Sequence, residues 1–114
     1  MKRGDLVIVN AGGDWGKPRP ALVIQSDILD DLSSVLVCLL SATLSGATTY
    51  RLRVDPSPAN GLKTVSEVQT DKIAMMRREK CEGPIGRLSP EQMDVVDRNL
   101  AFVTGLADSL RRAR

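Results

Sequence analysis

Short runs of apolar residues recur along the first two thirds of the chain, separated by residues typical of turns. The runs are rich in Val, Ile and Leu and only a few residues long, which predicts β-strands rather than helices. Five such segments are present: LVIVN (6–10), ALVIQ (21–25), SVLVCLL (34–40), TTYRLRV (48–54) and TVSEVQTDKIAMM (64–76). Their spacing predicts a compact antiparallel sheet or a small barrel.

Residues between and within these segments refine the prediction. Segment 48–54 alternates, with Tyr50, Leu52 and Val54 on one face and Thr49, Arg51 and Arg53 on the other, as in a strand with one solvated face. The stretch SDILDD (26–31) is consistent with a helical turn capped by Ser26. The stretch DPSPANG (55–61) predicts a turn, because it holds two prolines and an Asn-Gly pair.

The pattern changes to a helical one near the C-terminus. Ser89, Pro90 and Gln92 form the signature of a capping box with proline in the first turn. One apolar stripe with three- and four-residue spacing follows: Met93, Val96, Leu100, Val103, Ala107 and Leu110. This helix must bury its stripe against the sheet or a second subunit. It either ends at Gly105 or continues into the basic tail RRAR (111–114).

Length and composition indicate one globular domain spanning residues 1–114. Hydrophobic residues make up 42% of the chain, and its net charge of +2 permits but does not require an anionic partner. No apolar run approaches the ~20 residues that span a bilayer, and the N-terminus lacks the features of a signal peptide. The expected compartment is the cytoplasm, with no membrane contact.

The residue types present exclude much enzyme chemistry. The chain has no histidine, and Cys38 and Cys81 lack CxxC spacing, which argues against a zinc site and against an imidazole base. Cys38 lies in an apolar run and is expected to be a reduced core residue. No motif for a nucleotide or other cofactor is present, so no metal or cofactor is expected.

The sequence GDWGKPRPALVIQ (13–25) holds the strongest candidate for chemistry. Pro18 and Pro20 restrict the backbone on either side of Arg19. A guanidinium offers five donors in a planar fork that suits phosphate or carboxylate, and a stiff backbone lowers the cost of holding it in place. We therefore expect Arg19 to bind an anion in a fixed position. The alternative is a surface ion pair with Asp5 or Asp14.

Five blocks, in order over nearly the whole chain, resemble the MazF/PemK family of toxin endoribonucleases. They are MKRGDLVIVN, GKPRPALVIQSD, a strand ending in LLSAT, VSEVQTDKI and IGRLSPEQMDVVDRNLAFVTGL. The resemblance implies a mainly β fold with a C-terminal amphipathic helix, built on the small antiparallel barrel of PemK and CcdB, which is similar to the Src-homology-3 barrel. It also implies a homodimer and a cognate antitoxin that is acidic and partly disordered.

The activity that this resemblance implies is metal-independent, sequence-specific cleavage of single-stranded messenger or ribosomal RNA. Attack by the RNA 2′-OH would yield a cyclic phosphate and a 5′-hydroxyl. Two other functions stay open: a gyrase poison like CcdB, and a degenerate member that only binds RNA. The gyrase poisons end in Trp-Gly-Ile, whereas this chain ends in RRAR.

The family motifs assign roles to individual positions. Arg19 and Ser41 correspond to the main catalytic residues, and Asp14 holds the place of an acid that contributes in some members. Asp71 matches an aspartate used elsewhere in the family, and Thr43 is a second candidate hydroxyl for catalysis or substrate binding. The candidates for RNA binding are Trp15, Lys17, Arg51, Arg53 and Gln69.

Overall fold

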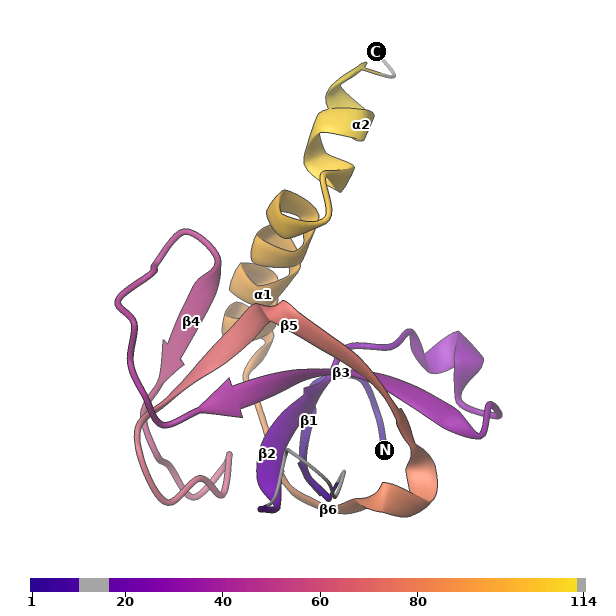
Figure 1. Cartoon of the computed structure of the whole chain (residues 1–114), viewed down its shortest axis with the longest axis vertical. Coiled ribbons are helices and arrows are strands. Elements are labelled where there is room, and N and C mark those ends of the chain that lie inside the picture. Colours follow the sequence, from indigo (N-terminus) through magenta and orange to yellow (C-terminus); the bar gives the residue numbers. More distant parts are fainter. Residues whose placement is uncertain (11–16, 113–114) are drawn as a thin grey trace.

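Six antiparallel strands form one strongly curved sheet in the computed structural model, which describes residues 1–10 and 17–112 (Figure 1). The strands are β1 (Asp5–Val9), β2 (Arg19–Val23), β3 (Ser34–Ser41), β4 (Arg51–Val54), β5 (Ser66–Arg77) and β6 (Cys81–Arg87). Their order across the sheet is β4-β5-β3-β2-β1-β6. The central position of β3 and β2 explains their nearly continuous apolar sequence, because both faces of these strands are covered.

The C-terminal helix begins where the capping pattern predicts. Helix α1 (Pro90–Val103) has a complete capping box, in which the Ser89 hydroxyl accepts from Gln92 N and the Gln92 side chain accepts from Ser89 N. Gly105, with φ of +76°, interrupts the helix, and α2 (Leu106–Arg112) follows. The chain therefore stops and restarts at Gly105, and α2 projects beyond the sheet (Figure 1).

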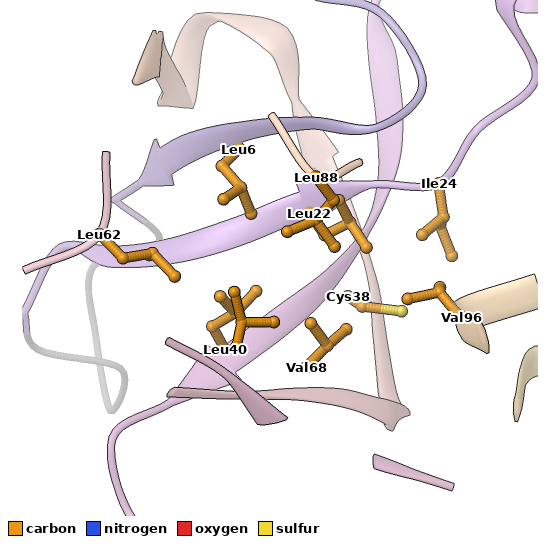
Figure 2. Packing of buried hydrophobic residues seen from close by; sticks show 10 residues of the cluster. Leu6, Leu22, Ile24, Cys38, Leu40, Leu62, Val68, Leu88 and Val96 are labelled. Carbon is orange, nitrogen blue, oxygen red and sulfur yellow. The ribbon is translucent and has the colours of Figure 1, made fainter. Parts of the chain in front are cut away.

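One face of the sheet packs against α1 and forms the larger part of the core. Figure 2 shows the Cys38 sulfur directed toward Val96 of α1 within this cluster. Cys38 is fully buried and reduced, as expected, and burial raises the pKa of its thiol to about 12. The buried members of the cluster are Leu6, Leu22, Ile24, Cys38, Leu40, Val54, Leu62, Val68, Leu88 and Val96. From the helix stripe, Met93 and Leu100 pack at its margin.

The opposite face of the sheet holds a second apolar cluster. Its members are Val7, Val9, Ala21, Val23, Val35, Val37, Leu39 and Met76. Successive residues of β2 and β3 thus alternate between the two clusters, as strand geometry requires. Two further expectations are confirmed: Ser26 caps a 3₁₀ turn at Asp27–Leu29, and residues 55–61 form a turn.

The mainly β class with a C-terminal helix is confirmed, and the expected small barrel takes the form of a curved antiparallel sheet that does not close (Figure 1). In the described part of the chain, β4 and β6 are the two edges of an open sheet. β4 is only four residues long, and the turn that follows it fills the space between the edges. Arg87 N of β6 donates to Ala59 O of that turn at 2.9 Å. At Gly86, a Cβ would lie 2.3 Å from the carbonyl carbon of Asn60, so this approach requires glycine.

The helices described for this chain include none long and apolar enough to cross a bilayer.

The exposed apolar side chains are scattered over the surface and along the two helices. Phe102, Val103, Leu106 and Leu110 are all more than one third exposed. The second half of the predicted stripe is therefore not covered by this chain's own sheet.

Replacing Leu22 by Ala tests the core around α1. Leu22 is 0% exposed, so its truncation should lower the free energy of unfolding by about 2–5 kcal/mol. The control is Ile28→Ala, because Ile28 is 88% exposed and should change stability by no more than about 0.5 kcal/mol. Urea denaturation measures both, and equal effects would contradict this description of the core.

Candidate active site

The pairing of β2 with β3 brings the two strongest candidate residues together. The register joins Ala21 to Leu39 and Leu22 to Cys38. Continued by two residues past Ala21, the same antiparallel register sets Arg19 opposite Ser41. Residues directly opposite in such a ladder project from the same face, with Cβ atoms about 4.5–5.5 Å apart. Two segments that are distant in the sequence therefore meet at one end of the sheet.

A pocket of about 470 Å³ opens at this end of β2 and β3. It is lined by Lys17, Pro18, Arg19, Pro20, Leu40, Ser41, Ala42 and Thr43. Both Lys17 and Arg19 are exposed, and Arg19 makes no salt bridge or side-chain hydrogen bond to another residue that the structure describes. Two cations and two hydroxyls in one pocket suit a phosphate.

The Ser41 hydroxyl is oriented by the turn that follows β3. Its oxygen accepts a hydrogen bond from Thr43 N at 3.1 Å. Because a hydroxyl has one proton and two lone pairs, this bond leaves the Ser41 proton available to donate. Ser41 is half-buried beside the exposed Arg19, so both side chains can donate to one anionic oxygen in the pocket.

The surface ion pair considered for Arg19 with Asp5 is absent from the described structure. Asp5 is 5% exposed and binds Arg87 Nη1 at 2.9 Å and Lys2 N at 2.7 Å. Arg3, from the same RGD block, donates to Ile24 O and pairs with Asp97 of α1. The RGD residues thus fasten the N-terminus to the helix and to β6, outside the pocket.

A second group of charged residues lies on β4 and β5. Arg51 donates from Nε and Nη2 to the two carboxylate oxygens of Asp71 at 3.0 and 2.9 Å, and its Nη1 lies 3.5 Å from Glu67 Oε1. The side chain of Arg51 is only 14% exposed. The expectation that Arg51 lines a solvated face is therefore wrong, because the two carboxylates of β5 draw the guanidinium onto the sheet.

This network also determines the protonation of the two acids. The hydrogen bonds from Arg51 hold the pKa of Asp71 below its usual value. Burial raises the pKa of Glu67, but hydrogen bonds from the backbone of Ser45 and Gly46 outweigh it, and the net pKa is lowered. Asp71 is therefore a carboxylate with both oxygens occupied, which makes it a weak proton acceptor.

The remaining candidates differ in how they relate to the pocket. Arg53 is exposed and lies 3.4 Å from Asp55, and Gln69 is buried between Leu39 of β3 and Arg51 of β4 in the ladder. Neither residue lines the pocket. Asp14 and Trp15 lie outside the described residues.

Glu67 is a residue that the sequence reasoning missed. The signal was present in segment 64–76, where Glu67, Gln69 and Asp71 alternate as Arg51 and Arg53 do in the neighbouring segment. Opposite charges in alternating positions of two paired strands predict cross-strand ion pairs. In the part of the chain that the structure describes, no three His, Cys, Asp or Glu side chains converge as ligands for a metal ion.

Comparison with known proteins gives consistent matches over nearly the full chain. Residues 2–104 match the family model described as PemK-like, MazF-like toxin of type II toxin-antitoxin system. A probable endoribonuclease MazF from Mycolicibacterium smegmatis is 39% identical over 108 residues, covering 94% of this chain and 99% of the relative. Endoribonuclease EndoA from Bacillus subtilis is 28% identical over 114 residues, covering 95% and 97%.

Solved structures show the same fold at lower identity. An endoribonuclease in complex with its cognate antitoxin, from a mycobacterial species, aligns with a TM-score of 0.78 at 20% identity. The alignment covers 93% of this chain and 96% of that chain. The open, curved sheet with its C-terminal helix is thus shared with that structure.

Replacing Asp71 by Asn tests the ion-pair network. The folded-state pKa of Asp71 is lower than the unfolded value of about 3.9, so its charge stabilises the fold above that pH. This stabilisation is lost as the pH falls through the folded-state pKa. The variant should have a lower urea midpoint than the wild type at pH 7, and the difference should shrink below about pH 4. A difference that is constant with pH would contradict the network.

Proposed function

Because the chain belongs to the PemK-like, MazF-like toxin family of type II toxin-antitoxin systems, we propose that it is the toxin of such a module and an endoribonuclease. Its substrate is single-stranded messenger or ribosomal RNA, cut at a specific sequence without a metal ion. The observation that carries the proposal is the pocket in which Arg19 lies beside Ser41. Cleavage arrests translation and growth until the antitoxin neutralises the toxin.

The chemistry requires little of the protein because RNA supplies its own nucleophile. The 2′-oxygen attacks the adjacent phosphorus, loses its proton, and forms a 2′,3′-cyclic phosphate. The bond from phosphorus to the 5′-oxygen breaks, and this oxygen gains a proton to leave as a 5′-hydroxyl. Arg19 binds the non-bridging oxygens as their charge builds, and Ser41 donates a hydrogen bond to the same phosphate.

Proton transfer needs a group other than Arg19, because a guanidinium stays protonated at any physiological pH and is therefore a poor acid or base. We assign the acceptor to Asp14, the acid five positions before Arg19. Asp71 is the weaker candidate, because Arg51 occupies both of its oxygens.

The proposed RNA path runs from the pocket across the same end of the sheet. Lys17 and Thr43 line the pocket and bind flanking phosphates or sugars. Arg53 is exposed on β4 and offers a further phosphate contact. Trp15 stacks on an unpaired base, whereas Gln69 and Arg51 shape the floor of the path from their buried positions.

The proposed partners are a second copy of the chain and an acidic, partly disordered antitoxin. A mycobacterial endoribonuclease of the same fold has been solved in complex with its cognate antitoxin. The exposed apolar residues of the helical stripe support a dimer, because a face of this kind is usually covered by a partner. The proposed compartment of the whole module is the cytoplasm.

Replacing Arg19 by Ala tests the proposed function. The variant should fold normally and cleave RNA at least about 10²–10³-fold more slowly, since it loses the main donor to the charged phosphate. Initial rates on a mixed RNA in EDTA measure this, with 5′-hydroxyl ends identified on the products. The matched control is Arg77→Ala, because Arg77 is exposed at the opposite end of β5. Wild-type rates for Arg19→Ala would refute the assignment.

A second experiment tests the proposed dimer. Wild-type protein should elute with about twice the 12.4 kDa mass of one chain in light scattering. Placing charges on the exposed apolar surface of the two helices with Phe102→Glu and Leu110→Glu together should shift the mass toward that of one chain. Ile28→Glu, an exposed change outside the helices, is the control. A doubly substituted protein that stays dimeric would exclude this face as the interface.

A further inference from the structure

Glu67 is a charged side chain in an almost fully enclosed position, 4% exposed, near the end of the sheet that holds the pocket. Its Oε2 accepts hydrogen bonds from Ser45 N at 2.9 Å and Gly46 N at 3.0 Å. Its Oε1 accepts from Ser45 Oγ at 2.9 Å and faces Arg51. Burying a carboxylate is costly unless it is paired and hydrogen-bonded, and here every visible partner comes from β4 or from the segment that follows β3.

This carboxylate is directly connected to the wall of the pocket. In the ladder between β3 and β5, Glu67 is the register partner of Ser41, the last residue of β3. Ser41 and Thr43 line the pocket, and Thr43 N donates to Ser41 Oγ. The segment from Ala42 to Gly46 is thus fixed at its start by the end of β3 and at its far end by Glu67.

The same segment has few other anchors among the residues that the structure describes. Ala42, Thr43, Leu44, Ser45 and Gly46 are all exposed, and the segment has no helix or strand of its own. Ser45 Oγ also accepts from Ala47 N at 3.1 Å, so the bond to Glu67 orders the next residue as well. A segment with this little apolar burial depends on its hydrogen bonds for a defined conformation.

We propose that Glu67 is a positioning residue for RNA cleavage, which holds the segment from Ala42 to Gly46 so that the Ser41 hydroxyl and Thr43 face the phosphate bound by Arg19. The inference rests on the proposed function. Glu67 does not touch the RNA itself. Arg51 and Asp71 support the position of Glu67, because Arg51 binds both carboxylates and so holds Glu67 against β4.

The acidic side chain suits this task better than its amide. A carboxylate has acceptor capacity on both oxygens, whereas glutamine offers one acceptor oxygen and one NH₂ donor. Glu67→Gln can therefore keep the two backbone bonds to Ser45 and Gly46 but presents a donor to Arg51. Glu67→Ala loses all of them. Glu67→Gln should therefore hold the segment from Ala42 to Gly46 better than Glu67→Ala does.

The test compares kcat and KM for RNA cleavage in five proteins: wild type, Glu67→Ala, Glu67→Gln, Ser41→Ala and the double variant that combines Glu67→Ala with Ser41→Ala. Glu67→Ala should lower kcat about 10- to 100-fold with little change in KM, because misplacing a group by about 1 Å costs rate rather than ground-state binding. Glu67→Gln should recover most of kcat. In the Ser41→Ala background, Glu67→Ala should cost clearly less than in the wild type, since coupled residues are not additive.

Three results overturn the inference while leaving the proposed function intact. These are a folded Glu67→Ala with the wild-type kcat, a loss of kcat that is equally large with Ser41 present or absent, and a Glu67→Gln no better than Glu67→Ala. If Glu67→Ala does not fold, Glu67→Asp replaces it, because it keeps the charge but withdraws the carboxylate from the segment. A folded Glu67→Asp with the wild-type kcat is then the overturning result. Wild-type protein that cleaves no RNA refutes the proposed function, and this role of Glu67 falls with it.

Discussion

The antiparallel ladder between β2 and β3 is the constraint on which the rest of the site depends. Both strands are buried on two faces, so a slip of one residue would move the side chains of each apolar cluster into the other and disrupt the packing of both. The core therefore fixes the register, and the register sets Arg19 opposite Ser41. Stability and function are coupled through this ladder, because the same pairing fills the core and assembles the pocket.

The structural charges of the sheet pair with one another in separate groups. Asp5 binds Arg87, and Glu67 and Asp71 share Arg51. β5 contributes to this arrangement through an irregularity: Cys38 pairs with Ile73 whereas Leu39 pairs with Gln69, so β5 has three additional residues between consecutive residues of β3. This bulge bends the strand and brings Asp71 within reach of Arg51. The structural charges thus have partners, and Arg19 lies in the pocket without a described one.

Much of the fold could be predicted from the sequence, because local patterns determined it. The five apolar segments all contain strands, although β4 begins only at Arg51 because residues 48–50 form a turn, and the Ser26 turn and the Ser89 capping box appear where capping chemistry places them. β6 was not predicted, because CEGPIGR has one large apolar residue and a glycine at position 86 that only the neighbouring turn explains. The same turn lies between the two edge strands, β4 and β6, so the open form of the sheet also depends on a contact that is long-range in the sequence.

The site was predictable only in part. Restricted backbone around Arg19 and the family motifs pointed to the pocket residues, and the structure brings Lys17, Arg19, Ser41 and Thr43 together. The role of Arg51 was mistaken because strand alternation tells which face a side chain occupies but not which acids lie across from it. Glu67 was missed for the same reason, since its partners Ser45 and Gly46 are 22 and 21 residues away in the chain.

The central claim is that the protein positions the phosphate and stabilises its charge while the RNA supplies the nucleophile. The most direct measurement uses the preferred cleavage site, once mapped, in an oligonucleotide with a single 2′-deoxy nucleotide on the 5′ side of the scissile phosphate. In EDTA, this substrate should stay intact while the all-ribose oligonucleotide is cut to a cyclic phosphate and a 5′-hydroxyl. Cleavage of the 2′-deoxy substrate at a comparable rate would contradict the account.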